Sequence, residues 1–214
     1  MKTARKVNFY FATAVLVFAL ASGGCATMAP KAEKYVPPPL GSTFTYSLSR
    51  TGSYGSGTME PTMKITERTW EGRRVLAFAS PNVTILVNAD GSWPAWLAPD
   101  GKPILTWDPP IGYDFPLEVG KTWTKSYRVT IHAAQRTMPV DGTWKVESYE
   151  DLKIPAGTFK VFKVRYSDTM GNENTQWYYP AFGCFVKESR ERTGKCPIGP
   201  GTSESELISH TITK

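Results

Sequence analysis

Residues 159–166 read Phe159-Lys160-Val161-Phe162-Lys163-Val164-Arg165-Tyr166, a stretch in which apolar and basic side chains nearly alternate. A period of two predicts a β-strand with one buried face, and its register decides which of the apolar residues point inward. Just upstream, Pro155 and Gly157 predict a tight turn that reverses the chain into this strand. The stretch therefore indicates a β fold.

The same alternation recurs along the chain at 43–48, 127–131 and 143–147, and dipeptides typical of turns separate the apolar runs. The turn dipeptides are Asp90-Gly91, Asp100-Gly101, Asp141-Gly142 and Gly171-Asn172. No stretch of about twelve residues after position 24 has helical periodicity with caps, so residues 40–214 are predicted to be a mainly β domain. Its expected core residues are Phe44, Tyr46, Val129, Ile131, Trp144, Val146, Phe159, Val161, Phe162 and Val164.

Comparison of the chain with itself indicates an internal duplication at a spacing of about 80 residues. The matching segments, in the same order in both halves, are 40–45 with 119–124, 63–67 with 144–148, and 96–99 with 177–180. Common β patterning and common turn residues are the alternative explanation. We expect two related units, 40–117 and 118–214, that share one core as a single antiparallel twisted sheet or an open half-barrel.

The N-terminus carries the features of a secretory signal, because Lys2, Arg5 and Lys6 precede an apolar run over 9–21 that is too short to span a bilayer. The small residues before Cys25 resemble the lipobox of bacterial lipoproteins, although Ser22 stands where that family usually has Leu. The resemblance implies removal of residues 1–24 and acylation of Cys25 with fatty acids such as palmitate. Cleavage after Ala19-Leu20-Ala21, which would give an unlipidated secreted protein, is the alternative.

Residues 25–39 have no apolar periodicity, and their prolines favour an extended, semi-rigid chain. We therefore expect a lipidated Pro-rich tether that holds the domain at a membrane. Ala26 is not the Asp that retains enteric-type lipoproteins in the inner membrane, so that resemblance implies the outer membrane, facing the periplasm.

The charge balance argues against nucleic acid as a partner. The whole chain has a formal net charge of +6, and loss of Lys2, Arg5 and Lys6 with the signal leaves 22 basic and 19 acidic residues, or +3. These charges are mixed along the chain, with no basic run.

The chain has three cysteines, Cys25, Cys184 and Cys196. Acylation of Cys25 would leave one pair in an oxidising compartment, which predicts a disulfide between Cys184 and Cys196. Two separate buried thiols are the alternative. A metal site is not expected there, because neither His132 nor His210 lies near the pair in sequence.

The second half of the chain carries a further resemblance, over residues 115–212. Its most specific motif is Pro155-Ala156-Gly157-Thr158-Phe159, accompanied by the segments 116–123, 177–183 and 206–209. In this order the segments resemble a family of exported bacterial proteins and lipoproteins of unassigned function. Their β domains are related to the half-barrel of periplasmic lipoprotein carriers, so the resemblance implies a fold and a compartment.

Four tryptophans are candidate ligand contacts: Trp93, Trp96, Trp107 and Trp177. Aromatic side chains near loops could stack on the faces of a glycan or hold an apolar ligand. Packing in a core or turn is the alternative, particularly for Trp96 and Trp177, which occupy equivalent places in the two proposed units.

The sequence contains no G-x-S-x-G, H-E-x-x-H, phosphate-loop or dinucleotide motif. Neither of its two histidines stands in a motif with a catalytic partner. We therefore expect no enzyme, catalytic residue or cofactor. The prediction is a cell-envelope lipoprotein whose β domain binds an envelope component. The alternative is a carrier of lipid or lipoproteins that uses the concave apolar face of an open sheet.

Overall fold

The computed structural model describes residues 30–214, so the expected signal (1–24), Cys25 and residues 26–29 lie outside the described part of the chain. Strands form most of this part, together with two single-turn 3-10 helices, η1 (His132–Ala134) and η2 (Pro180–Phe182). The prediction of a mainly β domain is confirmed. From residue 30 onward, no helix has the length and apolar character needed to cross a membrane.

The strands follow one another as a meander in which nearly every strand pairs with its neighbour in sequence. They are β1 (Lys31–Ala32), β2 (Thr43–Gly52), β3 (Gly57–Met59), β4 (Thr62–Trp70), β5 (Arg73–Ala79), β6 (Thr84–Val87), β7 (Trp93–Leu97), β8 (Pro103–Ile111), β9 (Leu117–Glu118), β10 (Thr122–Ile131), β11 (Arg136–Ile154), β12 (Gly157–Asp168), β13 (Asn172–Tyr179), β14 (Cys184–Arg192) and β15 (Gly201–Thr211). β1 pairs only with β9, and the others belong to one antiparallel sheet.

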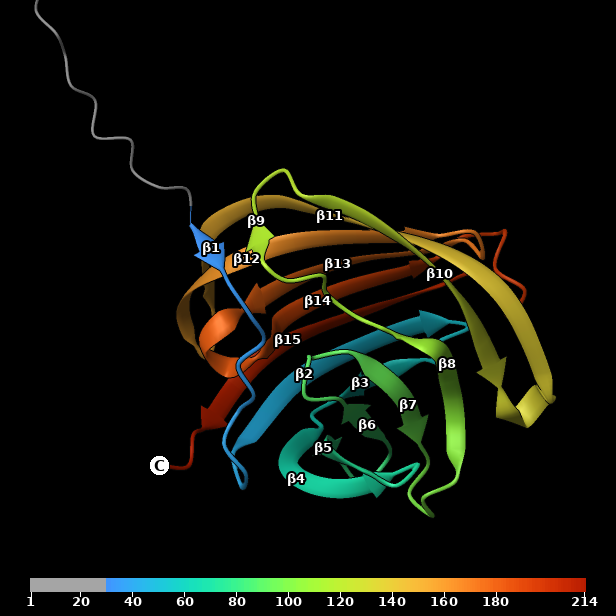
Figure 1. The fold of residues 1–214 in the computed structure, drawn as a ribbon, viewed down its shortest axis with the longest axis horizontal. Coiled ribbons are helices and arrows are strands. Elements are labelled where there is room, and N and C mark those ends of the chain that lie inside the picture. The colour runs from blue at the N-terminus through green and yellow to red at the C-terminus, as the bar shows by residue number, and fades with distance from the viewer. Residues whose placement is uncertain (1–29) are drawn as a thin grey trace, which may run out of the picture.

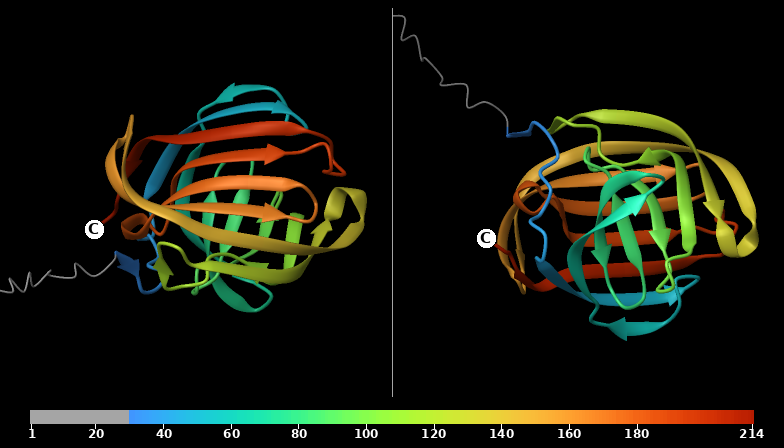
Figure 2. Two further views of the ribbon diagram at one scale, coloured as in Figure 1. Left: turned by 90° about the horizontal axis from the view of Figure 1, so that it is seen from above. Right: turned by 60° about the horizontal axis from the view of Figure 1, so that its bottom comes forward.

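The large sheet closes on itself, because β15 pairs with β2 from Gly201↔Gly52 to Thr211↔Thr43. The result is a closed barrel of 12 strands, with the short β3 alongside β2 (Figure 1). Two further views show the strands curving around a common interior (Figure 2). The expectation of a single open sheet or an open half-barrel is therefore wrong. Closure satisfies the backbone groups of two strands that an open sheet would leave as free edges.

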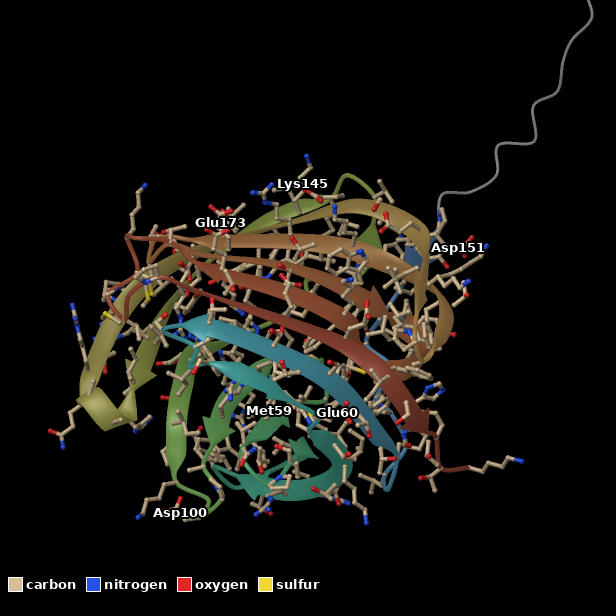
Figure 3. The ribbon with its side chains drawn as sticks, turned by 180° about the vertical axis from the view of Figure 1, so that it is seen from behind. Met59, Glu60, Asp100, Lys145, Asp151 and Glu173 are labelled. Atoms are coloured by element: carbon tan, nitrogen blue, oxygen red, sulfur yellow. The ribbon has the colours of Figure 1, made fainter. Side chains whose placement is uncertain are left out.

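The stretch that indicated a β fold forms β12 and lies between two apolar clusters of the barrel. Phe159 and Val161 belong to one cluster, and Phe162 and Val164 belong to the other. All the predicted core residues lie in these clusters, with Ile131 only partly buried. β11 and β12 are joined by the tight turn expected before Gly157. Exposed side chains such as Lys145 and Asp151 lie on the outer surface (Figure 3).

Three of the four predicted turn dipeptides lie at turns, where Gly91, Gly101 and Gly171 have φ angles of 86°, 83° and 83°. The prediction of a turn at Asp141-Gly142 is wrong, because both residues lie inside β11. A Cβ on Gly142 would come within 2.8 Å of the Trp144 ring, so this glycine is required by close packing.

Residues 30–39, which we call the strap, include β1, lead toward β2 and cross one end of the barrel (Figures 1 and 2). They were expected to be part of a tether outside the domain. Instead Ala32, Tyr35 and Pro38 are buried. Over its described part the tether is thus docked on the barrel, and order begins before Leu40.

Candidate functional site

The interior of the barrel holds a partly open cavity of about 180 Å³ that is lined by residues from both halves of the chain. A cavity of this size holds several water molecules or one small organic molecule. One wall is aromatic and comes from β7, β8 and the segment after β8. In this wall the ring centroids of Trp96 and Trp107 lie 5.7 Å apart and those of Trp93 and Tyr113 lie 6.0 Å apart, both in edge-to-face geometry.

A chain of hydrogen bonds crosses the facing wall, which β13 and β14 provide. The Tyr113 hydroxyl donates to Oε1 of Gln176 (2.6 Å), and Nε2 of Gln176 donates to Oε1 of Glu188 (2.6 Å). Nε of Arg190 donates to the other oxygen of Glu188 (2.6 Å). The Arg190 guanidinium also lies 5.2 Å from the centroid of Trp96, so a cation–π contact joins the polar and aromatic walls.

A second hydrogen-bonded chain lies at the cavity end formed by the β12–β13 turn. The hydroxyls of Tyr127 and Tyr166 are 2.6 Å apart, and Tyr166 donates to Oδ2 of Asp168 at 2.6 Å. Asp168 also accepts from the side-chain amide of Asn172 at 2.8 Å and from the backbone N–H groups of Met170 and Asn172. These bonds fix the carboxylate at the cavity wall.

The cavity is electrically balanced. Its charged lining residues are Asp168, Glu188, Arg190 and Arg192, whose formal charges cancel. Burial raises the pKa of the Cys184 thiol to about 12, with a smaller opposing effect from its hydrogen bond with Tyr46. At neutral pH this thiol therefore carries no charge. Burial also holds the pKa values of the lining tyrosines above their usual range, as at Tyr113. A ligand without net charge suits this interior best, because a buried unpaired charge is costly.

Several polar atoms of lining residues are buried and make no hydrogen bond within residues 30–214. They are the hydroxyls of Tyr35 and Tyr178, Nε1 of Trp96, Oδ1 of Asn174 and Nε of Arg192. The indole and guanidinium groups can only donate, the amide oxygen can only accept, and the hydroxyls can do both. Buried polar groups normally have partners, and water or a ligand that offers both donors and acceptors would satisfy these atoms.

The predicted ligand-contact tryptophans divide into two groups. Trp93, Trp96 and Trp107 line the cavity, whereas Trp177 does not. The Trp177 indole donates to Oε1 of Glu150 at 3.0 Å, and Nζ of Lys187 lies 5.6 Å from its ring. Trp96 and Trp177 were matched by the proposed duplication, but they have different environments. The duplication stays a prediction.

The prediction of a disulfide between Cys184 and Cys196 is wrong for this structure, because both thiols are free. Cys184 begins β14 and Cys196 follows its end at Arg192. An extended strand of this length spans about 26 Å, whereas a disulfide needs Cα atoms within about 7 Å. The alternative of two separate thiols holds, with Cys196 buried and Cys184 partly buried. Sγ of Cys184 lies 3.8 Å from the Tyr46 hydroxyl, whereas Sγ of Cys196 lies 4.0 Å from Oδ1 of Asn172.

Neither histidine lines the cavity. Nε2 of His132 lies 3.1 Å from Oγ1 of Thr106. His210 is exposed, and the centroid of its ring lies 4.7 Å from that of the Phe182 ring. Within the described range, no group of three His, Cys, Asp or Glu side chains could hold a metal ion.

Sequence reasoning missed the polar wall. Glu188, Arg190 and Arg192 stand at alternate positions of β14 and all line the cavity. Their spacing of two was a usable signal, but the intervening residues are polar too, so the pattern does not show which face is buried.

No protein-family model matches this chain, and no curated protein matches it. Solved structures to which it is similar include the following three, two of which it covers for nearly their whole length. A protein from Bacteroides fragilis that is described as exported and as having a YmcC-like fold has 13% identity and a TM-score of 0.49, over 84% of this chain and 99% of that one. A protein described as a lipoprotein from Parabacteroides distasonis has 9% identity and a TM-score of 0.43, over 84% and 99%. The hypothetical lipoprotein YmcC from Escherichia coli has 14% identity and a TM-score of 0.45, over 79% and 88%.

Proposed function

We propose that this protein is a cell-envelope lipoprotein, anchored through Cys25, whose barrel binds a small neutral polyhydroxylated molecule such as a sugar unit. The observation that carries the proposal is a cavity in which aromatic rings face a hydrogen-bonded polar wall. The proposal does not include catalysis or a cofactor.

The ligand class follows from the lining. Rings such as those of Trp96 and Trp107 offer rigid apolar surfaces to the C–H faces of a sugar. Trp96 Nε1, Asn174 Oδ1 and the Tyr178 hydroxyl are available as donor, acceptor and both, as hydroxyl groups require. A purely apolar ligand would leave these atoms unpaired, at a cost of about 1–3 kcal/mol for each group.

The carrier alternative loses the surface on which it depended. It required a concave apolar face on an open sheet, whereas the inner face of this sheet encloses a cavity within a closed barrel. Glu188 and Arg190 would also face an acyl chain there, which favours a polar ligand instead.

Calorimetric titration of the non-acylated Cys25→Ser chain with neutral hexoses and N-acetylhexosamines tests the binding proposal. We expect a neutral sugar to bind more tightly than a hexuronic acid or a fatty acid. Trp96→Leu should weaken that binding by about tenfold or more, because it removes one stacking surface and one donor. Trp177→Leu, which changes a tryptophan outside the cavity, is the matched control and should shift the affinity by less than about twofold.

Two results would overturn the ligand assignment. One is the absence of heat with every neutral sugar, and the other is an equal loss of binding in Trp177→Leu and Trp96→Leu. The anchor is tested separately, by intact mass of the mature protein and by fractionation of membranes. Acylation at Cys25 predicts an added acyl mass and outer-membrane location, both lost in Cys25→Ser, whereas cleavage after Ala21 would give an unmodified soluble chain.

A further inference from the structure

The strap meets the barrel with a period of three. Ala32, Tyr35 and Pro38 are buried, and the residues between them are exposed. A polyproline II chain has three residues per turn and makes no internal hydrogen bonds, so one of its edges can lie against a surface. Apart from its short β1 pairing, the strap therefore depends on these side chains for its position.

Tyr35 is the strap residue that lines the cavity, and two glycines make room for it. A Cβ on Gly91 would come within 2.8 Å of the Tyr35 ring, and one on Gly183 would come within 2.1 Å of the backbone oxygen of Val36. The centroid of Phe115 lies 6.4 Å from that of Tyr35. The ring is thus enclosed at the cavity wall, although its hydroxyl has no partner among the described residues.

Backbone contacts hold the strap weakly. β1 pairs with β9 over only two positions, Lys31↔Glu118 and Ala32↔Leu117. Between 33 and 38, no backbone hydrogen bond joins the strap to the rest of the described chain. Segments with few backbone hydrogen bonds open locally at lower free energy than paired strands. The strap is therefore held mainly by buried side chains, among which Ala32 and Tyr35 belong to the two apolar clusters, and not by a paired strand.

We propose that the strap is a removable closure of one end of the cavity, with Tyr35 as its plug, and that its release admits the ligand at that end. This inference rests on the proposed binding function, since it assigns regulation to the same cavity. The strap begins five positions after Cys25, a distance that an extended chain spans in about 18 Å at most. Access to the cavity is therefore coupled to the position of the barrel relative to the anchor.

The alkylation rate of the Cys184 thiol measures how often the strap opens, and it can be followed when no ligand is present. Cys184 lines the cavity and directly follows Gly183, against which the strap packs. Burial raises its pKa from 9.0 to about 12, so exposure to water would increase the thiolate fraction by up to about a thousandfold. A small rise in strap opening should therefore produce a measurable rise in alkylation rate.

The experiment follows alkylation of Cys184 by N-ethylmaleimide at about pH 8.5, using intact mass, in a Cys25→Ser, Cys196→Ser chain. Tyr35→Ala should react at least about tenfold faster than this parent. Ala32→Glu, which places a carboxylate at a buried strap position away from the plug, should accelerate the reaction as well and covers the case in which Tyr35→Ala does not fold. Val36→Ala changes an exposed strap residue and should stay within about twofold of the parent.

Equal rates in Tyr35→Ala, Ala32→Glu and Val36→Ala would overturn the inference. The inference would also fail if Tyr54→Ala alone accelerated the reaction, because access would then depend on a segment other than the strap. Tyr54 lines the cavity outside the strap, and the Arg192 guanidinium lies 3.8 Å from the centroid of its ring. Thermal unfolding of each variant is measured first, so that rates are compared only among folded proteins. Since no ligand is present, these outcomes are independent of the sugar titration.

Discussion

The pair formed by Glu188 and Arg190 should be the charged contact on which the stability of the barrel depends most. The Glu188 side chain is 3% exposed and that of Arg190 is 21% exposed. Glu188→Leu would leave the guanidinium without its counter-charge and Nε2 of Gln176 without its acceptor. Removing one partner of a buried pair costs about 3–5 kcal/mol, so we expect a loss of this size in the free energy of unfolding.

The matched control is a pair on the outer surface. Arg165 and Glu173 lie 3.1 Å apart with side chains 56% and 43% exposed, and Glu173 lies on the outside of the barrel (Figure 3). Glu173→Leu should cost less than about 1 kcal/mol, because solvent screens the pair. The double variant Glu188→Leu, Arg190→Met should recover much of the loss, since two apolar side chains leave no unpaired charge.

The assay is guanidinium unfolding followed by tryptophan fluorescence and circular dichroism, with the slope of the transition compared between variants. For a domain of this size the expected loss in Glu188→Leu corresponds to a fall in Tm of about 6–20 °C. A cost no larger than that of Glu173→Leu would refute the argument that this pair is buried and coupled. So would a double variant as unstable as the single one.

Three further predictions concern packing around Gly142, the carboxylate at the β12–β13 turn, and the stability of the fold at alkaline pH. Gly142→Ala should destabilise the barrel by about 1–3 kcal/mol in guanidinium unfolding, because the added Cβ would come within 2.8 Å of Trp144; an unchanged midpoint would contradict this. Asp168→Ala should cost at least about 2 kcal/mol in guanidinium unfolding, because it leaves the Tyr166 hydroxyl, the Asn172 amide and two backbone N–H groups without their acceptor; an unchanged midpoint would contradict this. The Cys184 thiol has a pKa of about 12 in the folded protein, against 9.0 for a fully hydrated cysteine, so the neutral thiol's contribution to the free energy of unfolding is complete below pH 9.0 and is lost as the pH rises toward 12. Cys184→Ala should therefore make the free energy of unfolding fall less steeply over this pH range, by about 1.4 kcal/mol per pH unit. Parallel curves of stability against pH for the two proteins would count against this prediction.

Local patterns predicted the strands, because the alternation of apolar and polar residues at 159–166 follows directly from one buried face. Closure was not predictable in this way. It depends on pairing between β2 and β15, and nothing in either strand identifies its partner. The error at Cys184 and Cys196 has a related cause, since residues near in sequence lie far apart when the chain between them is an extended strand.

The candidate site was only partly predictable for a different reason. Trp93, Trp96 and Trp107 were identified from their residue type, but residue type does not show which side of a strand a side chain occupies, as Trp177 illustrates. The polar wall was missed because β14 is polar on both faces near Glu188. The strap was missed because its burial has a period of three, which matches neither a helix nor a strand.

Pairing between β2 and β15 also determines when the protein can fold. The hydroxyl oxygens of Thr51 and Thr202, which are separated by 151 positions, lie 2.8 Å apart across this pairing. The ring cannot close until β15 has been synthesised, and contacts between such distant residues form slowly. Until then both strands present unpaired edges that could join to another chain.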